Sequence, residues 1–191
     1  MIKQPGRRQF MQLAAVGGLV YASGLRGWQA MAATTGRAQD DFYFVQLSDC
    51  HWGFKGAPNP DARGTLPKAI AAVNALSPAP DFVVFTGDLT HITENVDERR
   101  KRLTEFRDIA AQLKVPVVHY MPGEHDASLD NGEAYSALFG RTHYAFDHKG
   151  VHFIAIDNVS DPRAQVGEAQ LAWLAADLRS VPAHTPIVVF T

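Results

Sequence analysis

The side chains best suited to chemistry in this chain are carboxylates and imidazoles that each follow an apolar run of residues. The three runs read FYFVQLS, FVVFTG and VPVVHYMPG. Asp49 and His51 follow the first run, Asp88 follows the second, and Glu124 and His125 follow the third. Oxygen and nitrogen ligands of this kind suit Mn, Fe or Zn, and the single cysteine leaves no competing thiolate cluster. The pattern therefore predicts a transition-metal site.

Each apolar run has the composition of a buried β-strand. Residues 82–86 are β-branched or aromatic, and the run stops at a glycine just before Asp88. An α/β sheet presents its functional groups at the carboxyl ends of its strands. Asp49 and His51 are two residues apart, so extended backbone would turn both side chains to one face. A lone Gly-Asp pair often only caps a turn, but matching chemistry at two other strand ends favours a functional interpretation.

These residues, in this order, resemble the motifs of the calcineurin-like metallophosphoesterases. The Asp-x-His motif matches residues 49–51, and the Gly-Asp motif matches residues 87–88. The Gly-Asn-His-Asp/Glu motif matches residues 123–126, with Glu124 in the usual asparagine position. The later motifs of the family, a lone His after a strand and Gly-His-x-His, have no match before Thr191.

The resemblance implies hydrolysis of a phosphate ester, mono- or diester, at a centre of two divalent or trivalent ions of Mn, Fe or Zn. Two such ions activate water and neutralise the charge of the phosphoryl oxygens. Asp88 would bridge the ions. Asp49 and His51 would hold the first ion, and Glu124 would hold the second.

The resemblance also implies roles for three further residues. His125 would protonate the leaving oxygen or stabilise charge in the transition state, and Asp126 would hold the His125 imidazole in orientation. His91 follows Asp88 by three residues, in a loop close to the proposed ions. It could contact the substrate phosphate, or it could be a surface turn histidine, and the sequence leaves both interpretations open.

The fold implied by the resemblance is a four-layer α/β/β/α sandwich over residues 40–191, with the metals at strand ends. Periodicity alone reaches only an α/β class with several buried strands. In the first half of the chain, periodicity predicts a loop at 54–67 that could line the substrate mouth, a helix capped by Thr65, and a helix at 97–113. A short helix at 133–139 and a hairpin with arms 143–147 and 151–156 are predicted next. A helix that opens at 166–168 and a buried strand at 186–191 are predicted at the end.

Four other conspicuous features are interpreted as structural. The basic run at 99–102 lies beside acidic residues, which is typical of a solvated helix face rather than a phosphate patch. Cys50 is interpreted as a small buried filler, His119 as a packed histidine inside a strand, and Trp173 as a packing residue.

The first 32 residues are interpreted as a twin-arginine signal peptide. Arg7 and Arg8 form the arginine pair, residues 13–25 form a short apolar run, and residues 30–32 form a small-x-small cleavage site. An anchoring or amphipathic helix is the alternative, which the glycines of this run disfavour. We therefore expect the twin-arginine export machinery as a partner and a periplasmic or secreted protein.

The charge and the hydropathy of the chain argue against nucleic-acid binding and against membrane insertion. Removal of residues 1–32 takes away four of the 18 basic side chains and no acid, leaving 14 bases against 20 acids and a formal charge of −6. An acidic chain of this kind does not suit nucleic-acid binding. No later segment is long enough to cross a bilayer, so we expect no stable membrane insertion.

The apolar strand predicted at the end of the chain affects the expected metal binding and activity. Residues 186–191 open a strand that the family continues into a metal-binding histidine, so we expect an incomplete chain. Such a chain should bind at most about one transition metal and show no turnover. The alternative to an enzyme is thus an inactive fragment or pseudoenzyme with partial metal binding. A metal-free hydrolase is disfavoured, because no Gly-x-Ser-x-Gly elbow is present.

Overall fold

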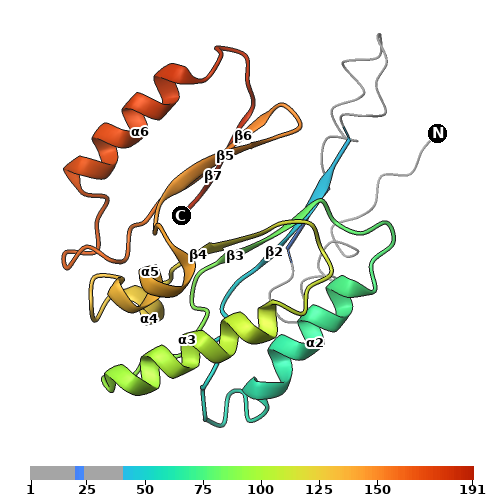
Figure 1. The fold of residues 1–191 in the computed structure, drawn as a ribbon, viewed down its shortest axis with the longest axis vertical. Coiled ribbons are helices and arrows are strands. Elements are labelled where there is room, and N and C mark those ends of the chain that lie inside the picture. Colours follow the sequence, from blue (N-terminus) through green and yellow to red (C-terminus); the bar gives the residue numbers. More distant parts are fainter. Residues whose placement is uncertain (1–19, 24–40) are drawn as a thin grey trace.

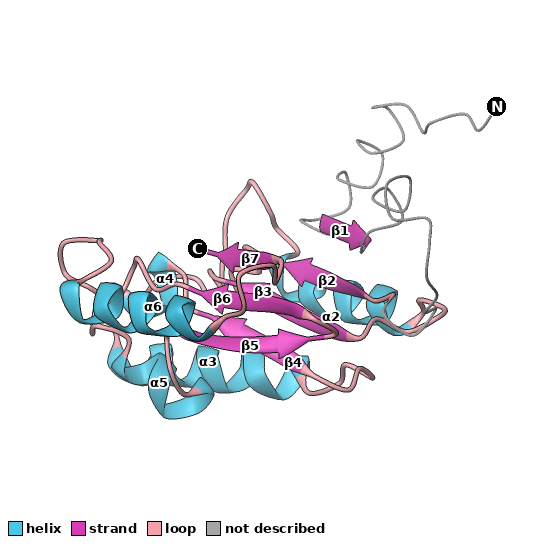
Figure 2. Ribbon diagram, turned by 90° about the horizontal axis from the view of Figure 1, so that it is seen from above, coloured by secondary structure: helices cyan, strands magenta, loops and turns pink. Residues whose placement is uncertain are grey.

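Two β-sheets stack face to face in the computed structural model, which describes residues 20–23 and 41–191, and helices lie on their outer sides (Figure 1). Figure 2 shows the strands of both sheets lying roughly along a common axis, with β1 and β5 antiparallel to their neighbours. The first sheet has the order β1 (Val20–Ser23), β2 (Tyr43–Leu47), β3 (Phe82–Thr86) and β4 (Val118–Met121), and the second has the order β5 (Tyr144–His148), β6 (Val151–Ala155) and β7 (Ile187–Phe190).

Parallel pairing in the first sheet brings the three functional strand ends together. Leu47 of β2 lies opposite Phe85 of β3, and Thr86 of β3 lies opposite Met121 of β4. Helix α2 (Ala62–Asn74) lies in the first crossover, and helix α3 (Val96–Ala110) lies in the second. Because these strands are parallel, their carboxyl ends meet at one edge of the sheet.

The central strand β3 is buried on both faces, which explains its unbroken apolar sequence. Val83 and Phe85 pack in a core cluster with α2 and α3. Phe82 and Val84 alternate with them and pack against the second sheet, where Phe153 of β6 is fully buried. The layers are therefore α/β/β/α, as the resemblance implied, with α6 (Glu168–Ser180) on the far side (Figure 1).

The second sheet is a hairpin joined to one parallel strand. β5 and β6 pair antiparallel around Lys149-Gly150, where both residues have positive φ. β7 pairs parallel with β6. This confirms the predicted hairpin, and helix α5 (Glu133–Phe139) confirms the predicted short helix to the residue.

Two predicted helix boundaries differ from the structure. α2 begins at Ala62, and Thr65 lies inside it, where its hydroxyl donates to the Asp61 carbonyl over 3.2 Å. The predicted helix at 97–113 is α3, which ends at Ala110. Leu113 is nevertheless buried, because its amide bonds the Ala110 carbonyl in a turn that continues the helix path.

The interpretation of the basic run on α3 as a solvated face is wrong for two of its four residues. Arg99 is 5% exposed and pairs with Asp130 over 2.8 Å. Arg102 bonds Glu98 and the backbone of the loop after β3. Arg100 and Lys101 do face solvent. Two of the four side chains therefore hold α3 to neighbouring loops.

The predicted strand at the end of the chain is present as β7, but it is not buried along its length. Ile187 is 43% exposed and Val189 is 49% exposed, whereas Phe190 is buried. Leu171 and Leu178 of α6 are also exposed. The outward side chains of β7 and these two leucines therefore leave apolar surface on the second sheet's side of the molecule.

Most of the predicted signal peptide lies outside the described residues, including Arg7, Arg8 and the expected cleavage site at 30–32. Within it, β1 is described and pairs antiparallel with β2, with Ser23 opposite Tyr43. Across the described ranges, every helix is too short or too polar to traverse a lipid bilayer.

Candidate metal centre

Three loops meet at the carboxyl edge of the first sheet. The Asp49 amide donates to the Gly87 carbonyl over 3.2 Å, and the His51 amide donates to the Asp88 carbonyl over 2.9 Å. The His125 amide donates to the Asp88 carboxylate over 3.1 Å. The loops after β2, β3 and β4 are thus joined directly, and Asp88 lies at their junction.

The backbone at this junction is strained at the residues expected to bind metal. Asp49, His51 and Asp88 have φ of 57°, 44° and 46°, in the left-handed region that is uncommon outside glycine, although Asp and His adopt it more often than most residues. The prediction that Asp49 and His51 continue the extended strand is therefore wrong, although their side chains do converge. Strain of this kind persists where the surroundings fix it and is concentrated at functional sites.

Two glycines permit the close approach of these loops. Gly87 has a φ of +104°, and a Cβ there would lie 2.9 Å from the Gly123 Cα. A Cβ on Gly123 would lie 2.2 Å from both the amide nitrogen and the carboxylate of Asp88. Any side chain at either position would therefore push the second and third loops apart.

A first group of candidate ligands comprises Asp49, His51 and Asp88. The His51 Nε2 lies 3.7 Å from the Asp49 carboxylate and 3.6 Å from the Asp88 Oδ2. Asp88 is buried, whereas the Asp49 side chain is largely exposed. One imidazole and two carboxylates suit a transition ion, so this donor set fits the metals expected from the sequence.

A second group comprises Asp88, Glu124 and His125, whose ligand atoms lie within 4.8 Å of one another. Glu124 and His125 open the one-turn helix α4 (Glu124–Ala127), which begins directly after Gly123. Glu124 is exposed and turns its carboxylate toward the same space as Asp88. Asp88 belongs to both groups, which places it between two possible ion positions.

A pocket of about 560 Å³ opens over these groups. Its lining includes every residue of both groups together with His91. Phe54, Pro58 and Asn59 form another part of the wall. The sequence suggested that the loop at 54–67 could line the mouth but did not single out these three residues, because loop side chains carry no periodic signal.

The family model for calcineurin-like phosphoesterases matches residues 42–189. This chain belongs to that family. The match includes both sheets, apart from β1 and the last residue of β7, and all the candidate ligands.

Relatives of this chain have several kinds of activity in their names. A probable glycerophosphodiester phosphodiesterase (GpdQ) of Arcobacter nitrofigilis is 31% identical over 148 residues, which cover 72% of this chain and 52% of that protein. The serine/threonine-protein phosphatase CPPED1 of mouse is 28% identical over 134 residues, 61% of this chain and 43% of that protein. The chain thus spans about half the length of the curated relatives it matches.

The fold of this chain is also that of a solved protein. A dimetal phosphatase from Danio rerio superimposes with a TM-score of 0.51 at 17% identity, over 78% of this chain and 69% of that one. At this identity the likeness is one of fold, and it agrees with the α/β/β/α layers described above.

The hydrogen bonding of His125 indicates which of its ring nitrogens carries the proton. Its Nδ1 accepts a hydrogen bond from the Ile92 backbone amide over 3.2 Å. In a neutral imidazole the other nitrogen, Nε2, then carries the proton. His125 lines the pocket, and in this tautomer its Nε2 can donate a hydrogen bond but has no lone pair for a metal.

Asp126 has partners different from the one expected. It is 1% exposed, and its carboxylate accepts from the amides of Gly123, Leu89 and Thr90 and from the Thr90 hydroxyl, over 2.9–3.0 Å. Burial raises the pKa of Asp126 to about 6, although these hydrogen bonds act to lower it. The carboxylate therefore braces the loop after β3, and the Ile92 amide takes the orienting position at His125.

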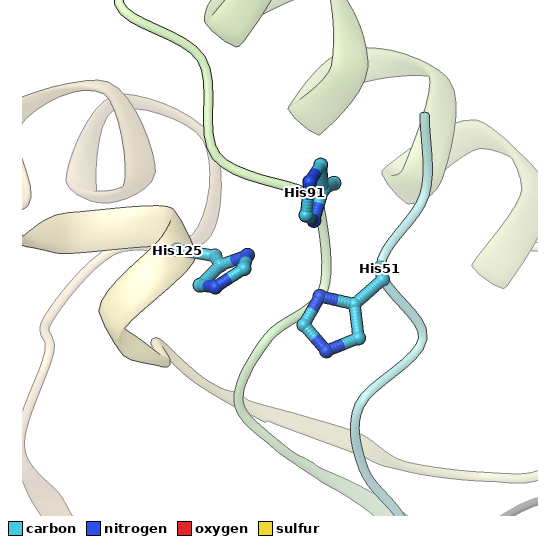
Figure 3. A group of neighbouring side chains, drawn as sticks. All are labelled: His51, His91 and His125. Carbon is cyan, nitrogen blue, oxygen red and sulfur yellow. The ribbon is translucent and has the colours of Figure 1, made fainter. Parts of the chain in front are cut away.

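His91 lies among the other imidazoles of the centre rather than on an isolated surface turn (Figure 3). Its ring centroid lies 5.6 Å from that of His51 and 4.9 Å from that of His125. Burial lowers the pKa of His91, and the nearby His125, His51 and Arg102 lower it further. A neutral imidazole at this position can both donate and accept hydrogen bonds.

Cys50 and His119 make packing contacts, and Cys50 also lines the pocket. Burial raises the pKa of the Cys50 thiol to about 12, and its acidic neighbours Asp126 and Asp49 act in the same direction. The thiol also packs against the core cluster beneath the first sheet. The His119 ring stacks on Phe146 with centroids 3.7 Å apart, and burial lowers its pKa to about 4.

Proposed function

We propose that this chain carries the catalytic centre of a metal-dependent phosphate ester hydrolase that uses two metal ions. The observation that carries the proposal is the position of Asp88 in both ligand groups. Its Oδ2 faces the His51 imidazole at 3.6 Å, and its Oδ1 accepts from the first turn of α4 at 3.1 Å. A carboxylate that belongs to both groups of candidate metal ligands is the arrangement that a bridging ligand requires.

Each residue of the centre has a proposed role. Asp49, His51 and Asp88 would hold one ion, and Asp88 and Glu124 would hold the other. Divalent or trivalent Mn, Fe or Zn supplies Lewis acidity, which lowers the pKa of water and neutralises phosphoryl charge. His125 would donate its Nε2 proton to the leaving oxygen.

The proposed substrate is a small-molecule phosphate ester. One relative is named a probable glycerophosphodiester phosphodiesterase and another a serine/threonine-protein phosphatase, so the proposal includes both monoester and diester substrates. The pocket volume of about 560 Å³ suits a small molecule, and Phe54 and Pro58 supply apolar wall for its organic group.

The test uses p-nitrophenyl phosphate and bis(p-nitrophenyl) phosphate after removal and replacement of metal. The sequence predicts no turnover for a chain without the later family motifs, whereas the two-metal centre proposed here predicts hydrolysis that depends on added Mn²⁺ or Zn²⁺. Under this proposal Asp88→Asn should lower the rate by roughly 100-fold or more. Asp108→Asn, an exposed aspartate on α3, is the matched control and should keep the wild-type rate. Equal rates in both variants would contradict the proposal.

A second candidate is a metal-binding domain without turnover. The tautomer of His125 favours it, because the second group then offers only the carboxylates of Asp88 and Glu124. Among the described residues the first group is thus the better site. One tightly bound ion per chain, with no hydrolysis of either ester at any metal concentration, would support this candidate over the enzyme.

We further propose that residues 1–32 direct export through the twin-arginine machinery to the periplasm or beyond. The support is the arginine pair, the apolar run and the small-x-small site in the sequence. Replacing both Arg7 and Arg8 with lysine should leave uncleaved precursor in the cytoplasm. Normal appearance of the double-lysine protein in the periplasm would refute the proposal.

A further inference from the structure

His51 has one ring nitrogen directed at the proposed metal position and one without a partner. Its Nε2 faces the carboxylates of Asp49 and Asp88. Its Nδ1 is buried and has no hydrogen-bond partner among the described residues. A histidine that binds metal through one nitrogen almost always donates the other N–H to an acceptor, which fixes the ring. If His51 binds metal through Nε2, its Nδ1–H therefore requires a nearby hydrogen-bond acceptor.

His91 offers such an acceptor. Its Nδ1 is also buried and has no partner in the part of the chain that the structure describes. The two rings are inclined at 69°, and ring nitrogens of His51, His91 and His125 lie within 4.8 Å of one another. Figure 3 shows that His51 turns one nitrogen toward the space between His91 and His125 and the other away from it.

His125 cannot serve as this acceptor. Its Nδ1 already accepts from the Ile92 amide, so its Nε2 carries the proton of the neutral ring. A donor on His125 and a donor on His51 would not bond to each other. For the same reason the three imidazoles do not form a nitrogen-only metal site, which would need a lone pair from each ring. His91 is the remaining imidazole.

We propose that His91 is a positioning residue, whose Nδ1 accepts the Nδ1–H of His51 and so directs the His51 Nε2 lone pair at the metal. The inference rests on the metal centre of the proposed function. Ring nitrogens of the two residues lie within 4.8 Å of one another, so the proposed contact requires a side-chain rotation that brings the two Nδ1 atoms to the hydrogen-bond length of about 3 Å. The Nε2–H of His91 then faces the pocket as a donor for a phosphate oxygen.

The backbone holds the two histidines side by side for this contact. The Trp52 amide donates to the Leu89 carbonyl over 3.0 Å, and the His91 amide donates to the Trp52 carbonyl over 2.9 Å. The Arg102 guanidinium donates to the His91 carbonyl over 2.8 Å. With both segments fixed, only side-chain torsions separate the two rings.

Co²⁺ binding to the 191-residue chain tests the inference. His91→Leu removes the acceptor and should weaken Co²⁺ affinity by about 10–100-fold and alter the visible spectrum of the bound ion. His91→Asn places a carbonyl oxygen near the position of Nδ1 and should restore the wild-type affinity to within about 3-fold. His184→Leu removes an exposed imidazole elsewhere and is the control.

A second readout is the ¹⁵N spectrum of the Zn²⁺-loaded protein. His51 should show a protonated Nδ1 and a metal-bound Nε2, and its Nδ1 proton should exchange with water much faster in His91→Leu. Wild-type affinity and spectrum in His91→Leu, or equal losses in His91→Leu and His91→Asn, would overturn the inference alone. A wild-type chain that binds no Co²⁺ would overturn the metal centre together with it.

Discussion

At the scale of single residues, Glu124 is the clearest departure from the family's motif. It places a carboxylate where the family has a neutral amide, which adds negative charge beside Asp88. A carboxylate ligand favours an ion that is more highly charged or more strongly Lewis-acidic than an amide does. We expect Glu124→Asn to fold normally and to change the preference among Mn, Fe and Zn, as measured by metal analysis after equilibration with all three.

Glu168→Gln is the matched control for this substitution. Like Glu124, Glu168 is exposed and opens a helix directly after a glycine, but it lies in α6. It should bind metals as the wild type does. If Glu124→Asn also keeps the wild-type metal content and preference, Glu124 is not a ligand.

The sequence identified which residues gather at the candidate metal centre, but it did not predict their backbone conformations. Asp49 and His51 were predicted on extended backbone, yet both have positive φ. Their conformations depend on hydrogen bonds to the loop after β3, a long-range contact that local sequence does not encode. The resemblance implied that Asp126 orients the His125 imidazole, but the single turn of α4 directs the Asp126 carboxylate into the core toward Leu89 and Thr90.

At the scale of elements, Asp126 joins the start of α4 to the loop after β3. Asp126→Asn keeps the size and shape of the side chain but places an amide N–H group against backbone N–H donors. This should lower the free energy of unfolding by about 2–3 kcal/mol, because hydrogen bonds to a charged group are lost and buried donors are left unpaired. Urea unfolding at pH 7 measures the change.

Thr90→Val separates this bracing role from general packing damage. It removes a single hydroxyl bond to Asp126 and should cost about 1 kcal/mol in the same unfolding experiment. A loss for Asp126→Asn no larger than that for Thr90→Val would mean that the carboxylate does not brace the loop.

His152 connects three elements of the second sheet's side. Its Nδ1 lies 2.7 Å from Asp147 of β5, and its Nε2 lies 2.8 Å from Asp177 of α6. Burial acts to lower the pKa of His152, but the hydrogen bonds with these two carboxylates raise it overall. The stabilisation is therefore fully present below the unfolded pKa of about 6.5 and is lost as pH rises through the higher folded pKa.

We expect the free energy of unfolding to fall more steeply above about pH 6.5 in the wild type than in His152→Gln. Urea unfolding across this pH range measures the difference between the two curves. His184→Gln, which removes an exposed histidine, should follow the wild-type curve. Parallel curves for wild type and His152→Gln would show that the imidazole is not held as a cation between the carboxylates.

The sequence predicted which segments form helices and strands better than it predicted which of their side chains are buried. The strands and hairpin followed from apolar runs and the Lys149-Gly150 turn. The burial of Arg99 was missed, although it lies on the same helical face as Leu103, Phe106 and Ala110. That spacing was a usable signal. Its ion partner Asp130, 31 residues away, was not foreseeable from local pattern.

At the scale of the whole molecule, the layer order came from the motif resemblance rather than from periodicity. Period-2 and period-3.6 patterns predict strands and helices but do not say which strands pair. The face-to-face packing depends on contacts such as Phe44 and Phe82 against Phe153, which join residues far apart in the chain. The family motifs supplied that long-range information, because their order fixes which strand ends must meet.

The same long-range convergence predicts that metal binding stabilises the entire fold. The first ligand group joins the ends of β2 and β3, and the second joins β3 to α4. Unfolding separates these segments and destroys both groups, so an ion binds the native state in preference to the unfolded chain. At a free ion concentration of about 100 times the dissociation constant, the gain is about 2.7 kcal/mol, or about 5–10 °C in Tm.

Thermal unfolding in chelator and in Mn²⁺ or Zn²⁺ measures this gain. Asp88→Asn should lose most of it, because Asp88 belongs to both groups, while Asp108→Asn on the surface of α3 should keep it. The comparison uses the shift between chelator and metal within each variant, so any stability that a substitution itself costs cancels. If Asp88→Asn gains as much from metal as the wild type does, the ion is bound elsewhere and the three loops do not form its site.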